Sequence, residues 1–241
     1  MGSSLEVFYH AHVKTRTCAL LLAIAAAAGL PARAQLTPWY VGIAVGESRT
    51  GRELVANRES TITNALSIST DFDARDVAFK ATVGYRFFPW LAVEVDYTDL
   101  GKHSLKSDMV GGDPPAAAGL FLERRVRGFG ADAVLFAPVA AQWKVYGRVG
   151  AFRARLEARQ ALGGNIVFTN GDPTERERST TQSETVLRWG AGTQFELSEC
   201  SGLRLEWQRQ EDIGKAFRIG GSGTTGEAPT DAVLVGFYYR F

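Results

Sequence analysis

The sequence has little excess charge of either sign, and it is poor in cysteine and histidine. Its 241 residues include 27 basic and 26 acidic side chains, 2 cysteines and 3 histidines. A nucleic-acid-binding domain carries a basic excess, so the near-neutral balance argues against a nucleic-acid partner. With so few cysteine and histidine side chains, we expect no transition-metal site and no cofactor.

Long apolar runs are also scarce. The apolar run at residues 18–30 follows Lys14 and Arg16 and precedes the triplet Ala32–Ala34. Thirteen residues are too few for a membrane helix. A basic start, a short apolar run and a small-x-small triplet are typical of a secretory signal peptide. We therefore expect a cleaved N-terminal extension and signal peptide, residues 1–34, and one domain, residues 35–241.

Removal of the signal peptide leaves one cysteine, Cys200, and one histidine, His103. An internal disulfide is then impossible, even in an oxidising compartment. The remaining chain has no apolar run near 20 residues, so we expect no membrane-spanning helix. The 26 glycines and 11% aromatic residues favour many strands over packed helices.

Alternation of apolar and polar residues recurs along the chain. It predicts eight strands at residues 38–48, 76–87, 90–98, 124–136, 142–155, 184–197, 202–210 and 231–241. Three connections are short, whereas residues 49–75, 99–123, 156–183 and 211–230 form long polar connections. Short turns at one end and long loops at the other are typical of an outer-membrane barrel. The predicted fold is all-β: an eight-stranded antiparallel up-and-down transmembrane β-barrel with short periplasmic turns and four long extracellular loops.

The glycines indicate which face of the strands points into the barrel. Two arrangements compete, because a soluble lipocalin-like barrel also has eight strands and places its apolar face inside. The polar face carries Gly42, Gly46, Gly84, Gly128, Gly130, Gly150, Gly190, Gly192 and Gly236. An eight-stranded barrel is just wide enough for side chains to fill. Glycines on the inner face would make room for long arginines, so we expect the charged face inside and the apolar face against lipid.

Large aromatic residues collect at the predicted short-turn end. They are Trp39, Phe87, Trp90, Phe136, Trp143, Phe237, Tyr239 and Phe241. Aromatic side chains favour the membrane interface, so this set predicts a periplasmic girdle. The last strand must also pair with the first, since an open sheet edge is not stable in hydrocarbon. A terminal phenylalanine on such a strand resembles the signal by which outer-membrane assembly machinery recognises its clients.

Several segments resemble the OmpA-type outer-membrane barrel: FPWLAVEVDYTDLG, VYGRVGAFRAR, WGAGTQFE, GLRLEWQRQEDIGKA and FYYRF. The resemblance extends over residues 38–241 and implies a Gram-negative outer-membrane protein. In that family a charged cluster plugs the lumen, and Glu94 and Arg204 stand at matching places. Val134 and Gln194 replace a lysine and a second glutamate of the family pattern. The periplasmic peptidoglycan-binding domain of longer members has no counterpart here, so that role is not carried over.

Charges of both signs lie on the predicted inner face. The expected lumen charge network comprises Glu94, Arg204, Lys80, Asp96, Asp132, Arg148, Arg188 and Glu206. Buried charges need partners, so these groups should pair with one another. Such a network either fills and rigidifies the barrel or acts as a gate.

Arginines mark the other rim of the barrel. Arg125, Arg127, Arg153 and Arg155 fall on the outward phase of two neighbouring strands. Guanidinium groups bind phosphate well, so one interpretation is a lipopolysaccharide contact patch. The alternative is a solvated rim paired with glutamates such as Glu123 and Glu157.

Catalysis and metal binding are weakly supported. His103, Ser104 and Asp108 suggest a lipid-modifying enzyme, but adjacent loop residues do not make a nucleophile with an oriented base. We therefore predict no catalytic residues. The acidic segment DFDARD, residues 71–76, lacks the glycine and the ligand spacing of a dedicated calcium loop.

Three functional hypotheses remain. The first is a structural and surface-interaction protein for envelope integrity and adhesion; the second is a narrow low-conductance pore; the third is a lipid-modifying enzyme. Expected partners are outer-membrane lipids, lipopolysaccharide, the assembly machinery, and host or phage ligands of the loops. We expect a monomer in the outer membrane of a Gram-negative bacterium, reached after signal-peptide export.

Overall fold

The structure is a computed structural model that describes residues 38–55, 65–111, 116–164, 177–215 and 226–241. The predicted signal peptide, with its cleavage site after Ala34, lies outside these ranges, as do parts of all four predicted long loops. Within the described ranges, no helix combines the length and apolar character needed to cross a membrane.

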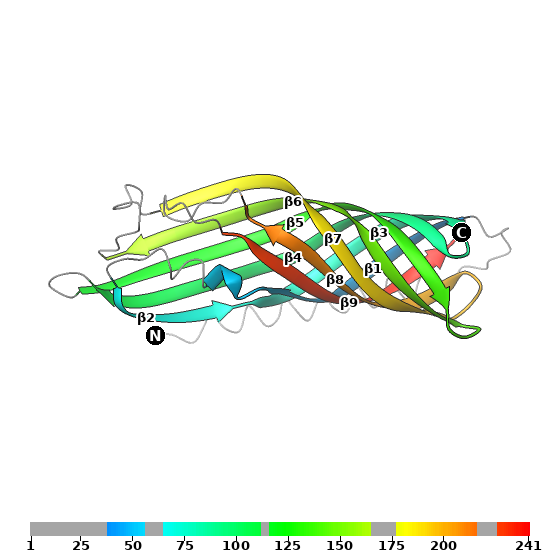
Figure 1. The fold of residues 1–241 in the computed structure, drawn as a ribbon, viewed down its shortest axis with the longest axis horizontal. Coiled ribbons are helices and arrows are strands. Elements are labelled where there is room, and N and C mark those ends of the chain that lie inside the picture. Colours follow the sequence, from blue (N-terminus) through cyan, green and yellow to red (C-terminus); the bar gives the residue numbers. More distant parts are fainter. Residues whose placement is uncertain (1–37, 56–64, 112–115, 165–176, 216–225) are drawn as a thin grey trace, which may run out of the picture.

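Strands account for most of the described chain. They are β1 (Trp39–Thr50), β2 (Ala65–Asp73), β3 (Arg75–Phe88), β4 (Leu91–Gly111), β5 (Ala116–Pro138), β6 (Trp143–Gly163), β7 (Glu177–Glu196), β8 (Ser201–Ile213) and β9 (Ala228–Arg240) (Figure 1). A single helical turn at residues 53–55 follows β1.

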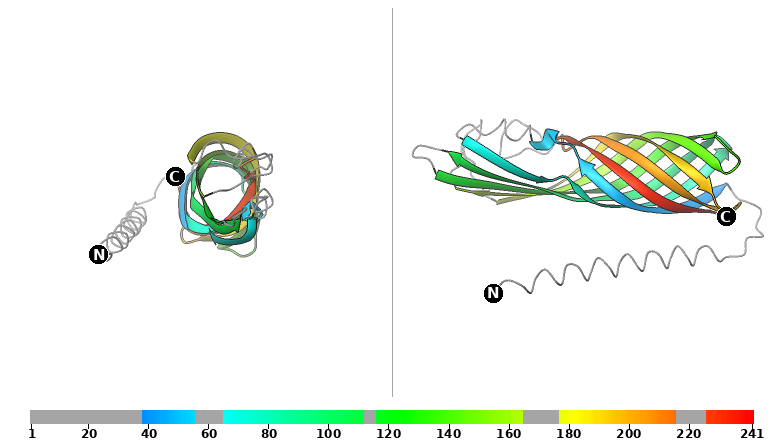
Figure 2. Two further views of the ribbon diagram at one scale, coloured as in Figure 1. Left: turned by 90° about the vertical axis from the view of Figure 1, so that its left-hand side faces the viewer. Right: turned by 90° about the horizontal axis from the view of Figure 1, so that it is seen from below.

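The strands close into an antiparallel ring. Its order is β4, β3, β1, β9, β8, β7, β6 and β5, and β5 pairs with β4 again. β2 lies outside the ring and pairs with the distal part of β4. The closing pair joins the first and last strands, with Val41 opposite Tyr239, and Phe241 N donates to Trp39 O at 3.3 Å. The predicted eight-stranded up-and-down barrel is confirmed, and Figure 2 shows the ring end on.

Two of the predicted long loops are wrong in large part, because β4 to β7 continue far beyond the expected boundaries. These strands have 21, 23, 21 and 20 residues, whereas about 9–11 residues cross a membrane. β4 and β5 stay paired up to Gly111 opposite Ala116. β6 and β7 stay paired up to Ala161 opposite Glu177. The loop predicted at residues 49–75 likewise contains β2.

We call the distal part of the molecule, residues 65–73, 102–111, 116–127, 153–163 and 177–185, the extension, and the rest of the ring the spanning barrel. The long strands reach past the ends of β1, β8 and β9 (Figure 1). A bulge between Asp99 and Lys102 of β4 marks the boundary. Gly101 has a φ of 77° there, and a Cβ on it would lie 2.5 Å from Asp76 Oδ2. Glycine is therefore required at this position, both for conformation and for space.

The polarity of the two faces inverts at this boundary. In the spanning part of β6, Val149 points outward and Arg148 points inward; in its extension, Arg155 points outward and Leu156 inward. The strand alternates without interruption, so the change lies in the residues and not in the register. Our boundaries ended too early because they followed the alternation of a lipid-facing strand, whereas the outer face of the extension is polar apart from side chains such as Val110 and Phe121.

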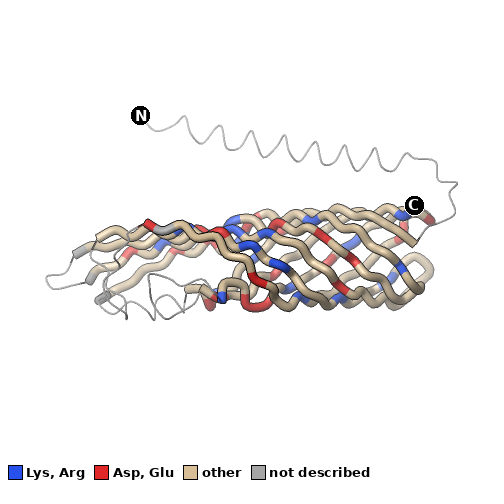
Figure 3. The backbone as a smooth tube through the Cα atoms, turned by 90° about the horizontal axis from the view of Figure 1, so that it is seen from above, with Lys and Arg blue, Asp and Glu red and all other residues tan. Residues whose placement is uncertain are grey.

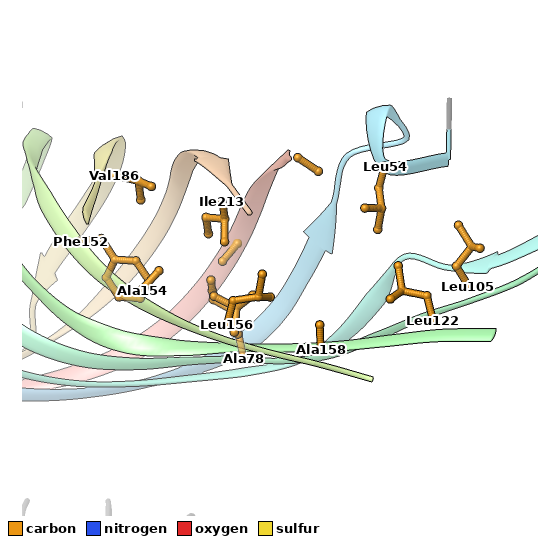
Figure 4. Close-up of a cluster of buried hydrophobic side chains, with 14 of the residues drawn as sticks. Leu54, Ala78, Leu105, Leu122, Phe152, Ala154, Leu156, Ala158, Val186 and Ile213 are labelled. Carbon is orange, nitrogen blue, oxygen red and sulfur yellow. The ribbon is translucent and has the colours of Figure 1, made fainter. Parts of the chain in front are cut away.

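The extension and the adjoining end of the barrel enclose an apolar core. Its buried members are Leu54, Ala78, Leu100, Leu105, Met109, Leu120, Leu122, Val126, Phe152, Ala154, Leu156, Ala158, Leu162, Val186, Ile213, Ala228, Ala232 and Leu234. Figure 4 shows Leu54 and Ile213 facing the long strands across this core. The extension is therefore built like a water-soluble β protein, with apolar side chains inside and polar ones outside.

Candidate functional site

The spanning barrel is filled by ion pairs around Arg148. Nη1 of Arg148 lies 2.8 Å from both carboxylate oxygens of Glu206 and 3.6 Å from Glu94 Oε2. Nη2 lies 3.1 Å from Asp96 Oδ2 and also contacts Asp132. One guanidinium thus contacts four carboxylates from three strands, and its side chain is fully buried.

A second arginine completes the same layer. Arg188 forms a bidentate ion pair with Asp96, with Nη1–Oδ1 at 2.9 Å and Nη2–Oδ2 at 2.5 Å. Its Nε donates to Asp132 Oδ1 at 3.1 Å. Bidentate pairs are the most specific form of carboxylate binding by arginine. Lys80 is another cation of this layer, and its Nζ lies 2.6 Å from Glu206 Oε1.

A third arginine lies nearer the short turns. Arg204 Nη1 is 2.5 Å from Glu94 Oε1, and its Nε donates to Gln194 Oε1 at 3.0 Å. Four aromatic rings surround its guanidinium, with centroids between 5.1 and 5.6 Å away: Tyr40, Phe136, Tyr146 and Tyr238. Such cation–π contacts add to the ion pair in a desolvated site.

All eight residues of the predicted charge network therefore come together. The four cations are Lys80, Arg148, Arg188 and Arg204, and the four anions are Glu94, Asp96, Asp132 and Glu206. Charge is balanced, which is what a buried cluster requires to be stable. Figure 3 marks the acidic and basic positions distributed along the barrel wall.

Sequence reasoning missed the tyrosines that complete the network. Tyr40 donates to Glu94 at 2.7 Å, and Tyr146 donates to Glu206 at 2.8 Å. Tyr238 accepts from Gln194 Nε2 at 2.8 Å. Their position on the polar phase of the strands was the available signal, since a hydroxyl-bearing ring there needs a buried partner.

The inner glycines make room for these long side chains. A Cβ on Gly130 would lie 2.0 Å from Arg188 Nη2, as expected from the sequence. A Cβ on Gly84 would lie 2.1 Å from the Tyr40 ring, so part of the space serves tyrosine instead of arginine. The cavity left beside Tyr40, Lys80 and Arg204 measures about 30 Å³. That volume holds about one water molecule, and the lumen is closed at this level.

The two substituted positions of the family pattern lie next to the plug. Val134 is buried with Ala92, Tyr40, Phe136 and Tyr146. Gln194 bridges Arg204 and Tyr238. Glu94 has Arg148 as its second cation, beside Arg204.

Most of the aromatic side chains predicted to form a girdle lie on the outer surface at the short-turn end, with two exceptions. Trp39, Phe87, Trp90, Trp143 and Phe241 are exposed, and Tyr239 packs edge-on against Phe241 at 5.5 Å. Phe136 was assigned wrongly: it points inward and packs on Tyr146. Phe237 was expected to face lipid, but only 8% of it is exposed; it lies opposite Ile43 and Leu203 of the neighbouring strands.

The rim arginines lie together at the start of the extension. Arg125 pairs with Asp99 at 2.5 Å, and Arg127 pairs with Glu157 at 2.6 Å. Arg155 shares Glu157 at 3.3 Å. In this sector Arg153 has a hydroxyl partner, Thr185, at 3.1 Å. Glu123, which we considered as a partner, pairs instead with Lys102 at 3.5 Å.

The residues considered for catalysis do not converge. His103 is buried inside the extension, and its Nε2 lies 3.2 Å from Ser48 Oγ. Ser104 follows it in β4 and points the opposite way, and Asp108 is exposed. Asp76 of the acidic segment accepts the backbone N–H of Val77 at 2.7 Å. Among the described residues, no three side chains of the metal-binding types gather in one place.

A closed antiparallel ring with an apolar outer belt and a charged interior defines an outer-membrane β-barrel. The family model of the outer membrane protein beta-barrel domain matches residues 17–241. The chain belongs to this family and is an outer-membrane protein of a Gram-negative bacterium.

Solved structures of similar shape include a surface protein, an attachment protein and a protease. Neisserial surface protein A is 16% identical, covers 86% of this chain and 100% of its own, and gives a TM-score of 0.48. Ail, the attachment invasion locus protein of Yersinia pestis, is 13% identical, with coverages of 85% and 100% and a TM-score of 0.40. Outer membrane protease OmpT of Escherichia coli is 10% identical, with 86% and 99% coverage and a TM-score of 0.41. No curated protein sequence matches this chain. Because the sequence identities are this low, the function has to be inferred from the residues of this chain.

Proposed function

We propose that the protein is a closed, surface-exposed barrel that serves envelope structure and surface interaction. The observation that carries this proposal is the contact of Arg148 with four carboxylates across the lumen. An open pathway would require several of these ion pairs to separate inside a narrow barrel. Leaving a buried charge without its partner costs about 3–5 kcal/mol, so a spontaneously open state would be rare.

The extension supports the interactive part of the proposal. Roughly ten residues of each long strand lie beyond the spanning barrel, which at about 3.3 Å per residue is roughly 30 Å along the strand. Its outer face is polar, with Lys106 and Arg159 among its exposed side chains. A rigid, polar surface held this far above the membrane suits adhesion to host ligands or recognition by phage.

Conductance separates this proposal from the alternative of a narrow pore. The mature chain, residues 35–241, is refolded and inserted into planar bilayers, and folding is checked by heat-dependent gel mobility. We expect no discrete conductance steps from the folded protein. Steps that change in Arg204→Ala would contradict the closed barrel and support transport of ions or small solutes.

A contact with lipopolysaccharide is a second element of the proposal. Arg125, Arg127 and Arg155 pair with only two carboxylates, Asp99 and Glu157, and Arg153 contacts the Thr185 hydroxyl, so the sector keeps a positive excess. It lies just outside the apolar belt, at the level of outer-leaflet phosphates. Replacing all four arginines with glutamine should reduce lipopolysaccharide retention. A Lys106→Gln/Arg159→Gln variant, altered farther out, should retain it, and equal retention by all three proteins would refute the contact.

Export and assembly complete the proposal. The N-terminal extension and signal peptide at residues 1–34 would direct export, and the assembly machinery would recognise β9 and Phe241, which follows it. Phe241→Ala should slow membrane insertion in cells without changing the stability of the refolded barrel by much. An unchanged insertion rate would exclude this role for Phe241.

A further inference from the structure

A cavity of about 650 Å³ opens at the short-turn end of the barrel, below the plug. It is lined by Pro38, Arg86, Phe87, Phe88, Pro89, Trp90, Phe136, Pro138, Lys144 and Arg240. A volume of this size is in the range of small-molecule sites. We call it the vestibule.

The side chains of the vestibule carry an excess of positive charge. Three cations line it, Arg86, Lys144 and Arg240. The carboxylate of Glu196 lies nearby; it pairs with Lys144 and lies 4.0 Å from Arg240 Nη2. The Glu196 carboxylate therefore lies close to two of the three cations, Lys144 and Arg240, and does not pair with Arg86.

Arg86 makes no ion pair with any described residue. Its guanidinium lies over the Phe136 ring, 4.4 Å from the centroid, and over Tyr40 at 5.8 Å. Its Nε is buried without a hydrogen-bond partner. Stacking on aromatic faces orients the planar fork while its N–H groups remain available, which is a favourable arrangement for a phosphate oxygen.

The depth of the vestibule indicates what reaches it. Phe87 and Trp90 belong to the exposed aromatic girdle, and Trp90 stacks on Phe88 at 5.4 Å. Aromatic girdles lie at the headgroup level of the membrane. With the short turns in the periplasm, the vestibule therefore opens where inner-leaflet headgroups and periplasmic solutes meet.

We propose that the vestibule binds a phosphate-type anion, held by Arg86 with Arg240 as the second cation. The anion is either the headgroup phosphate of an inner-leaflet phospholipid or a free phosphate of the periplasm. This inference is independent of whether the lumen conducts, because the site lies outside the plug.

The test compares Arg86→Gln with Arg159→Gln, a matched control on the outer face of the extension. Inorganic phosphate is titrated against the refolded barrel in dodecyl maltoside micelles, which contain no phosphate, by calorimetry. Retention of phosphatidylglycerol by barrels extracted from nanodiscs is measured in parallel by native mass spectrometry. We expect Arg86→Gln to weaken phosphate binding, phosphatidylglycerol retention or both at least tenfold, and the control to match the wild type.

Loss of phosphate binding alone would assign the site to a free anion, and loss of lipid retention alone would assign it to a headgroup. Equal values for wild type and Arg86→Gln in both measurements would overturn the proposal. If Arg86→Gln does not fold, Arg86→Lys, which keeps the charge and loses the fork, supplies the same comparison. A wild-type barrel that conducts, but still binds phosphate in an Arg86-dependent way, would refute the closed lumen and leave this site standing.

Discussion

The spanning barrel and the extension use the same strands, β4 to β7, and bury opposite kinds of side chain. In the barrel, Arg148 and Arg188 lie inside among carboxylates, and valines such as Val149 lie outside. In the extension, Leu122 and Leu156 lie inside. The difference follows from the medium: lipid outside accepts only apolar side chains, whereas water outside accepts charged ones.

The two regions should also differ in what stabilises them. The extension gains free energy from apolar burial, at about 25 cal/mol per Å² removed from water. The barrel interior instead depends on charge pairing, which is sensitive to the loss of a single partner. The predictions that follow use this difference, from the largest expected effect to the smallest.

Replacing Arg148 with methionine should destabilise the spanning barrel most. The change would leave four carboxylates with fewer cations, and removing one partner of a buried pair costs about 3–5 kcal/mol. Urea unfolding of the barrel from lipid vesicles measures the loss. Arg159→Met, with an exposed side chain, serves as the control and should unfold like the wild type. Equal midpoints for the two variants would contradict the role of the network.

Exchanging outward residues across the boundary should have unequal effects. Val149→Arg places a cation in the lipid-facing belt and should cost about 2–4 kcal/mol, as measured for such positions in other barrels. Arg155 is the second outward residue beyond the boundary in β6. Arg155→Val removes a solvated charge and should leave the unfolding midpoint almost unchanged. Similar losses in both variants would place the boundary elsewhere.

Acid should loosen the extension through His103. Burial, together with the nearby Arg124, lowers the pKa of His103 to about 4, although Asp76 and Asp73 oppose the shift. A histidine whose folded pKa is lowered stabilises the fold above pH 6.5, and this contribution is lost as the pH falls towards 4. The difference corresponds to about 3 kcal/mol at most.

Hydrogen exchange of the β4 amides in the extension, compared at pH 7 and pH 4.5, measures this effect. The His103→Gln variant removes the titrating group and should reduce the change. If wild type and His103→Gln lose protection equally on acidification, another group is responsible.

The smallest expected change in stability comes from a charged side chain that is buried in the extension, among apolar residues. Arg124 points into the apolar core of the extension; its Nη1 lies 3.4 Å from Gly226 O, and its Nε and Nη2 have no partner. Burial lowers the pKa of Arg124 to about 10. Arg124→Leu removes two buried donors that have no partner and should therefore stabilise the extension by about 1 kcal/mol, the lower end of the cost of such groups. Slower hydrogen exchange in β5 would support this, and faster exchange would contradict it.

The sequence was sufficient to predict the spanning barrel. Along its strands the outer face is consistently apolar, and the inner face carries charged residues with glycines beside them. The pairing of particular charges was not predictable, because Arg148 meets partners from β4, β5 and β8 only after the ring closes. The stacking of Arg204 between tyrosines depends on the same closure.

The extension was missed for a physical reason. Its strands alternate as regularly as those of the barrel, but charged residues such as Lys106, Glu157 and Arg159 occupy the outward phase beyond the predicted ends. A polar outer face interleaved with Ala154, Leu156 and Ala158 is the pattern of a soluble strand. The bulge at Gly101 also shifts the inward phase of β4 from Leu100 to His103, so one continuous alternation does not describe that strand.

The inversion itself can be measured along β6. Single cysteines at alternate positions from Val145 to Arg159, in a chain with Cys200→Ser, are spin-labelled after refolding into bilayers. Accessibility to oxygen reports lipid contact, and accessibility to a water-soluble nickel complex reports water. The structure predicts lipid contact up to Ala151 and water contact from Arg153 onward. Lipid contact that continued through Glu157, or water contact that began before Ala151, would contradict the division of the molecule into a spanning barrel and a water-exposed extension.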